Sequence, residues 1–169
     1  MNIKKLSLLS MLLALALIFG YVEALIPIYL GVPGAKLGLP NAVMLIVLYL
    51  YGPREAFIIN ITRILLNGFL FTNLFSICYS LAGGLLSLFI MFLLVKYTDF
   101  SITAVSALGG TVHNIGQFIM AVFVLNTFSI IGYLPFLIIT GCIMGTLLGF
   151  VASLIIPTVS QLPKNGGNP

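Results

Sequence analysis

The sequence predicts an all-α membrane protein with six transmembrane helices, and two observations lead to this prediction. Of the 169 residues, 61% are hydrophobic and only 6% are charged, whereas a soluble domain is about 25% charged. A soluble fold of this size has no core large enough to bury so much apolar surface. At roughly 20 apolar residues per crossing, the length accommodates about six helices with short loops. We expect residues 1–159 to form a single transmembrane domain.

The first predicted helix covers residues 6–25. Its charged start before an apolar run resembles a signal peptide, but no small-residue cleavage site followed by polar sequence comes after it. We therefore expect the helix to be retained. The next stretch, Pro27–Pro40, holds three prolines and three glycines and is expected to be a loop.

Two shorter helices are predicted over residues 39–51 and 54–71. Gly52 and Pro53 separate them, because the pair stops one helix and proline suits the first turn of the next. Glu55 in that turn complements the positive end of the helix. The helix over residues 39–51 is short for a membrane crossing.

Three longer helices are predicted over residues 74–95, 102–125 and 133–156. In the last of these, small residues recur every four positions, which lets another helix approach closely; they are Gly141, Gly145, Gly149 and Ser153. Residues 160–169 are expected to form a disordered cytoplasmic tail.

Positively charged residues predict the orientation of the bundle. With six crossings and an inside N-terminus, most basic residues lie on the inner side, namely Lys4, Lys5, Arg54, Lys96 and Lys164. Only Lys36 lies outside, and Arg63 lies within the membrane. This asymmetry predicts that both termini are cytoplasmic, in a multi-pass protein of the bacterial cytoplasmic membrane.

A polar stripe runs along the helix predicted over residues 54–71. Asn60, Arg63 and Asn67 are spaced i, i+3 and i+7, so they share one face of the helix. An arginine in mid-membrane is costly and usually faces a protein interior or a water-filled cavity. We expect the stripe to bind a polar or anionic ligand. The alternative is that Arg63 only satisfies groups inside the bundle.

Other polar residues are expected at the same depth as this stripe. The predicted topology brings them to the outer halves of neighbouring helices; they are Glu23, Lys36, Asn41, Tyr79, His113, Asn114 and Gln117. The inner halves carry far fewer strongly polar side chains. We therefore predict a polar chamber that is open to the outside and closed below, as in a binding protein rather than a continuous pore.

Several functions are excluded by what the sequence lacks. There is no GxxxxGK[ST] phosphate loop, so the chain cannot hydrolyse ATP alone. The acidic residues Glu23, Glu55 and Asp99 divide between the two membrane sides and cannot together hold Mg²⁺. The basic residues are scattered and form no nucleic-acid-binding cluster. We predict no catalytic residue, no metal site, no cofactor and no enzymatic activity.

Three segments carry a resemblance to a known family. Lys36–Leu66, Tyr79–Leu94 and Gly109–Ala121 resemble the bacterial Gx transporter family, which is also described as heptaprenyl diphosphate synthase component I. That family is similar to the substrate-binding S components of energy-coupling factor (ECF) transporters. The resemblance implies a six-helix S-component-like bundle that captures vitamins from outside, together with a transmembrane coupling subunit and two ATPases.

The resemblance also implies a partner-docking face on the first helix. In S components this face carries an alanine-xxx-alanine motif, and the corresponding small residues here are Ser10, Ala14, Ala16 and Gly20. Serine at the first of these positions departs from the usual motif. The alternative is that these residues pack against the chain's own helices.

Two functions are therefore expected, and a scaffold that binds no ligand is a third alternative. The first is an ECF S component that captures a polar or anionic small molecule, such as a flavin, from the outer side. The alternative is a non-catalytic membrane accessory subunit for polyprenyl diphosphate or quinone synthesis, in which Arg63 and Lys36 hold a diphosphate.

Overall fold

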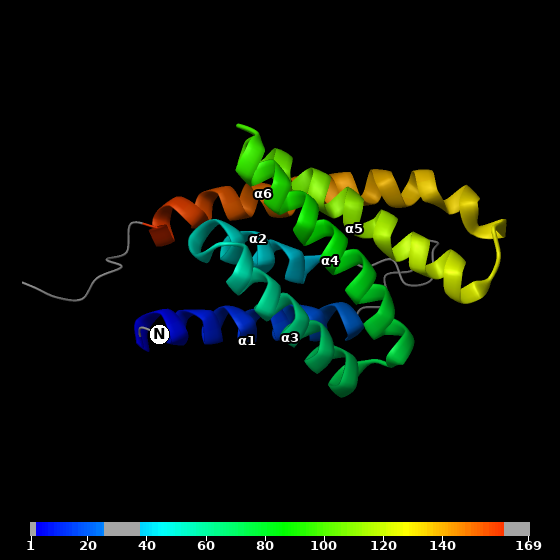
Figure 1. The fold of residues 1–169 in the computed structure, drawn as a ribbon, viewed down its shortest axis with the longest axis horizontal. Coiled ribbons are helices and arrows are strands. Elements are labelled where there is room, and N and C mark those ends of the chain that lie inside the picture. Colours follow the sequence, from blue (N-terminus) through cyan, green and yellow to red (C-terminus); the bar gives the residue numbers. More distant parts are fainter. Residues whose placement is uncertain (1–2, 26–37, 161–169) are drawn as a thin grey trace, which may run out of the picture.

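The computed structural model describes residues 3–25 and 38–160, which are helical almost throughout (Figure 1). The prediction of an all-α membrane protein is confirmed, since the described residues form no strand. The elements follow in the order α1 (Ile3–Leu25), α2 (Leu39–Tyr51), α3 (Pro53–Phe71), α4 (Leu74–Tyr97), α5 (Ile102–Leu125), the short 3₁₀ helix η1 (Ser129–Tyr133) and α6 (Leu134–Ser160).

Local sequence explains where the helices begin and end. Gly52 has a φ of 96°, a backbone conformation that favours glycine, and it lets the chain turn directly from α2 into α3. Asn73 caps α4 by accepting a hydrogen bond from the backbone N–H of Ser76 over 2.9 Å. Three helices extend beyond the predicted spans: α1 begins at Ile3, α4 ends at Tyr97 and α6 ends at Ser160, with Pro157 inside its last turns.

The short helix α2 is the centre of the bundle. Eight of its 13 residues are buried, and it lies between α1 and α6 (Figure 1). At 1.5 Å per residue it is about 20 Å long, shorter than the roughly 30 Å hydrocarbon layer. The helices α1, α4, α5 and α6 are long and apolar enough to cross a membrane. Complete crossings by α2 and α3 stay a prediction.

The glycine spacing of α6 predicts close approach of another helix, and in the structure that helix is α5. A Cβ atom on Gly110 would lie 2.5 Å from the carbonyl oxygen of Gly141, so the two backbones touch at this point. Asn114 strengthens the contact by donating from Nδ2 to the carbonyl oxygen of Leu137 over 2.8 Å. On the other side of α5, Ser87 of α4 donates to the carbonyl oxygen of Gly109 over 2.8 Å.

The bundle has an apolar half and a polar half. The apolar half contains the beginning of α1, most of α2, the beginning of α3, the end of α4, the beginning of α5 and the end of α6. Its buried core includes Ala16, Leu45, Ala56, Met91 and Val105. The N-terminus and the end of α6 lie at this same end of the molecule (Figure 1). The opposite ends of the same helices carry the polar residues described below.

Candidate functional site

Arg63 is the buried cation at the centre of the polar half. Only 6% of the residue is exposed. Its Nε donates to Oδ1 of Asn60 over 3.0 Å, and its Nη2 donates to Oδ1 of Asn41 over 3.1 Å. Asn60 is itself held by α4, because its Nδ2 donates to the carbonyl oxygen of Gly84 over 3.0 Å. Two neutral amides therefore orient the guanidinium group.

The protein leaves much of the hydrogen-bonding capacity of Arg63 unused. A guanidinium group carries five N–H donors, and the described residues accept from it only through the amide oxygens of Asn60 and Asn41. The described residues contain one ion pair, between Lys5 and Glu55, so Arg63 has no carboxylate within 4.0 Å among them. A buried guanidinium group with donors to spare is suited to a ligand that accepts hydrogen bonds.

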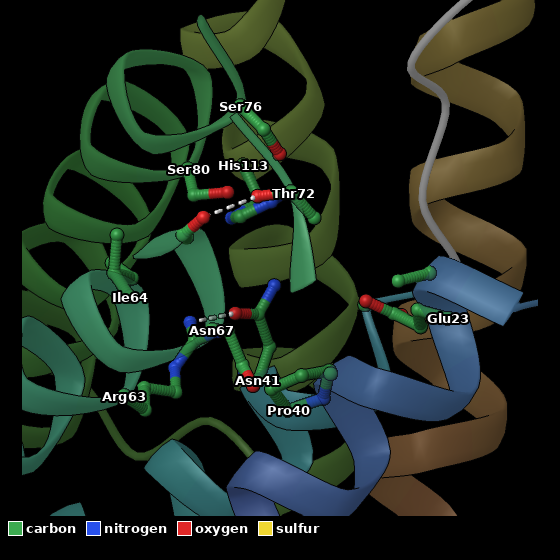
Figure 2. Close-up of a pocket in the computed structure, with 14 residues that line it drawn as sticks. Glu23, Pro40, Asn41, Arg63, Ile64, Asn67, Thr72, Ser76, Ser80 and His113 are labelled. Carbon is green, nitrogen blue, oxygen red and sulfur yellow. Dashed lines mark hydrogen bonds between the residues drawn. The ribbon is translucent and has the colours of Figure 1, made fainter. Parts of the chain in front are cut away.

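Arg63 lines a cavity between α1, α2, α3, α4 and α5 (Figure 2). The cavity has a volume of about 50 Å³, enough for a few water molecules. Drug-sized ligands occupy pockets of roughly 300–1,000 Å³. This volume matches a small polar group. The lining of the cavity includes Glu23, Asn41, Arg63, Asn67, Thr72, Ser76, Ser80 and His113.

Glu23 supplies a negative charge to the same cavity. It stands at the end of α1, and its Oε1 accepts a hydrogen bond from the backbone N–H of Leu39 over 2.7 Å. This bond ties the first turn of α2 to α1. In Figure 2, Glu23 and Arg63 approach from opposite sides, with Asn41 between them in that view. The two charges attract each other although they form no ion pair.

Asn67 adds an unsatisfied acceptor to the cavity wall. Its Oδ1 is buried, and no hydrogen-bond donor among the described residues reaches it. The side chain packs on Gly20 of α1, where an added Cβ atom would collide with it. A buried carbonyl oxygen without a donor is unfavourable unless water or a ligand reaches it.

A second, smaller cavity of about 20 Å³ lies deeper, towards α6. Asn41 and His113 line both cavities, so they stand at the boundary between the two. Asn114 lines only the deeper one, where its amide also bonds α6. The polar residues of α5 therefore divide between the two cavities and the helix contact.

The remaining predicted residues lie elsewhere. Asn60 is fully buried behind Arg63 and lines neither cavity. Gln117 is buried against Gly83, and Tyr79 also lines neither cavity. Lys36 lies outside the described residues.

Thr72 and Ser76 also line the cavity, which was not predicted from the sequence. The spacing of Ser76 and Ser80, four residues apart on α4, indicates a shared helix face. Their hydroxyl groups can donate or accept. The hydroxyl of Thr72 already donates to the carbonyl oxygen of Gly68 over 3.3 Å, so its oxygen can only accept from a group in the cavity.

The small residues of α1 divide between two faces. Ser10 and Ala14 are exposed, whereas Ala16 is fully buried in the apolar core and Gly20 packs on Asn67. The four residues therefore do not form one continuous docking face. Ala16 and Gly20 serve packing inside the bundle.

The fold and this cavity define a class: a helical membrane protein with a buried arginine beside a polar cavity. Among the residues that the structure describes, no group of three or more histidine, cysteine or acidic side chains could hold a metal ion.

Comparison with known proteins gives the family. The chain belongs to the heptaprenyl diphosphate synthase component I family, whose model matches residues 12–155. The prediction that the chain is not itself an enzyme agrees with this family, whose description names a component of a synthase. No curated protein and no solved structure matches the chain. The likeness to ECF S components has no support from these comparisons and stays a prediction.

Proposed function

We propose that the chain is a non-catalytic membrane subunit that binds a polar or anionic small molecule in the Arg63 cavity and acts with a partner enzyme of polyprenyl diphosphate synthesis. The environment of Arg63 supports binding: the residue is buried, is oriented by two amides and lines a cavity. The family description supports the partner, since it names one component of a heptaprenyl diphosphate synthase. The partner would then be the soluble component that carries the chemistry.

Co-purification tests this proposal. The chain is extracted in mild detergent, and its bound proteins and small molecules are identified by mass spectrometry. We expect a soluble prenyl diphosphate synthase among the proteins, and we expect the chain alone neither to extend prenyl diphosphates nor to hydrolyse ATP. Prenyl transfer by the chain after removal of every other protein would contradict the proposal.

A second candidate is an S component driven by ATPases of an ECF transporter. The observation that favours it is the exposed pair Ser10 and Ala14 on α1, a helix with little buried surface. Small exposed residues at four-residue spacing allow a partner helix to approach. Recovery of a coupling subunit with two ATPases, in place of a prenyl synthase, would favour this candidate.

Enlarging a small residue of α1 shows whether that residue contacts a partner protein or packs inside the bundle. Ala14→Leu should release a coupling subunit without affecting the fold, because Ala14 is exposed. Ala16→Leu should lower the melting temperature, because Ala16 has no exposed surface. If Ala14→Leu leaves all partners bound, the exposed pair is not a docking site.

The proposed topology places both termini in the cytoplasm of a bacterial cell, with the polar half of the bundle facing outwards. After replacement of Cys78 and Cys142, single cysteines at Gly132 and Asp99 test it. Gly132 has open space around it, and Asp99 is exposed. An impermeant thiol reagent on intact cells should label Gly132→Cys but not Asp99→Cys, and the reverse pattern would invert the orientation.

A further inference from the structure

The end of α1 forms one wall of the Arg63 cavity. Three of its last six residues, Gly20, Glu23 and Ala24, line the cavity. Ala24 is also exposed, as is Thr72 of the cavity wall, which follows α3 directly. The cavity therefore reaches the surface at the ends of α1 and α3. Only 6% of Arg63 is exposed, so a ligand larger than a few water molecules reaches it only when a wall moves.

The preceding part of α1 is fixed to the bundle. Ala16 has no exposed surface and belongs to the apolar core. Phe19 is the last residue of α1, among those that the structure describes, that packs against this core. Near the start of the helix, Lys5 adds an ion pair with Glu55. The core therefore holds α1 as far as Phe19 and not beyond it.

The last six residues of α1 contact α3 through side chains. Gly20 packs on the side-chain amide of Asn67. The rings of Tyr21 and Phe71 lie 4.7 Å apart between their centres. Side chains move by rotation about single bonds, so these contacts can open without displacing the backbone of α3. By contrast, α5 and α6 touch through their backbones, which cannot rotate away from each other.

Gly20 lies where the fixed part of α1 meets its last six residues. Glycine is a weak helix former, and hinges between moving parts often contain small residues. Beyond this position, the carboxylate of Glu23 accepts the backbone N–H of Leu39 over 2.7 Å and connects α1 to the start of α2. The segment is thus joined to its neighbours by a few separate contacts after a flexible residue.

We propose that residues 20–25 of α1 form a gate, which swings about Gly20 and opens the Arg63 cavity to a ligand. The ring contact between Tyr21 and Phe71 holds the gate closed against α3. The hydrogen bond to the start of α2 holds it on its other side. This inference rests on the proposed binding function and gives its ligand a route of entry.

A buried cysteine on the cavity wall reports the opening of the gate. Ile64 lines the cavity and is only 2% exposed, so Ile64→Cys should react with N-ethylmaleimide when the cavity opens. The reaction rate is measured by mass spectrometry on detergent-solubilised protein in which Cys78 and Cys142 are replaced by alanine. An aromatic pair is strong enough to change an equilibrium about two- to tenfold. We expect Tyr21→Ala to raise the rate by about this factor.

Two controls separate gate opening from a general loss of stability. Val105→Cys is a second reporter, at a position with no exposed surface in the apolar core, and it should not react faster when Tyr21→Ala is introduced. Phe123→Ala removes a ring that is 80% exposed on α5. This variant should leave the rate at Ile64→Cys unchanged.

A double-mutant cycle tests the ring contact itself. Phe71→Ala should raise the rate at Ile64→Cys about as much as Tyr21→Ala does. The double variant should react no faster than either single variant, because both substitutions remove the same contact. If the two effects multiply, the rings act independently and their contact does not hold the gate.

The reaction rates also separate this inference from the proposed function. If Tyr21→Ala accelerates neither reporter, the end of α1 is not the gate. If it accelerates both reporters equally, the substitution loosens the whole bundle and the inference is wrong. These rates are measured without a ligand, whereas the proposed binding function is tested by co-purification, so either can fail alone.

Discussion

The apolar and polar halves of the bundle are built from the same helices but differ in how they fill space. In the apolar half, Leu45 and Val105 have no exposed surface and pack in an entirely hydrophobic core. In the polar half, Arg63 is almost as well buried, yet it lies beside a cavity and keeps unused donors. In the apolar half, the helices pack tightly without polar side chains. Tight packing therefore does not explain why the polar half contains polar side chains.

This difference indicates that the two halves of the bundle have different roles. The apolar half supplies the continuous hydrophobic core, whereas the polar half leaves a cavity beside its buried charge. A charge in mid-membrane costs at least about 2.5–3.5 kcal/mol on insertion scales. The hydrogen bonds that Arg63 donates to Asn60 and Asn41 offset part of this cost. Substitutions in the two halves should consequently change different properties.

The largest effect on stability is expected in the apolar half. Leu45→Ala removes a fully buried side chain from the centre of α2 and should lower the free energy of unfolding by about 2–5 kcal/mol. Ligand affinity per folded molecule should not change. The control Leu147→Ala, at a residue that is 56% exposed, should change stability by less than about 0.5 kcal/mol. Equal effects of the two would mean that the apolar half is not the stabilising core.

An intermediate effect is expected where the two halves meet. Asn60→Ala removes the acceptor of Arg63 Nε and the donor to the carbonyl oxygen of Gly84. We expect a loss of about 1–3 kcal/mol in stability and weaker binding, because Arg63 loses an orienting partner. Thr62→Ala on the same helix is the control, since its hydroxyl donates only to the carbonyl oxygen of Ile58. Unchanged binding by Asn60→Ala would show that Arg63 needs no such support.

The smallest effect is expected at the apolar end of the molecule. Lys5 and Glu55 form an ion pair there, and the ammonium group of Lys5 lies 5.6 Å from the ring centre of Tyr51. Both charged side chains are partly exposed, so Glu55→Gln should cost no more than about 1 kcal/mol. Binding should be unaffected, and thermal unfolding together with calorimetry checks both statements. Altered binding would mean that the two halves are coupled.

Much of the helical fold could be predicted because its signals are local. The Gly52-Pro53 pair marks the end of α2 and the beginning of α3, and Asn73 caps α4. The glycine spacing of α6 predicts close contact with another helix, and the structure shows that this helix is α5. Each of these features depends on residues that are close together in the sequence.

The site was less predictable, because its contacts join separate helices. The hydrogen bond from Arg63 to Asn41 spans 22 positions in the chain and depends on how α2 packs against α3. Within α4, the side chain of Tyr79 points about 100° away from that of the neighbouring Ser80, and Ser80 lines the cavity. The stripe on α3 was predicted as one binding surface, but Asn60 lies behind Arg63 instead of on the cavity.

The division of α1 between two faces could have been derived from helix geometry. Ser10 and Ala16 are six residues apart, which places them about 120° apart around the helix. One is exposed and the other fully buried. Which of the two faces lies inside could not be predicted, because both are equally apolar in sequence.

The Arg63→Gln substitution tests most directly whether the polar half is a ligand-binding site. Affinity for the co-purifying molecule and melting temperature are measured on the same preparation. Arg54→Gln is the matched control, since it removes the same charge from an exposed position on the same helix. We expect Arg63→Gln to remain folded and to bind at least about tenfold more weakly, because it loses a charge-assisted hydrogen bond worth about 1.5–3 kcal/mol.

Arg63→Lys should restore binding only in part, since an ammonium group lacks the planar fork of guanidinium. Arg54→Gln should bind like the wild type. An Arg63→Gln protein with a lowered melting temperature and unchanged affinity per folded molecule would contradict the hypothesis that Arg63 binds a ligand. Arg63 would then be a structural residue of the bundle and not part of a binding site.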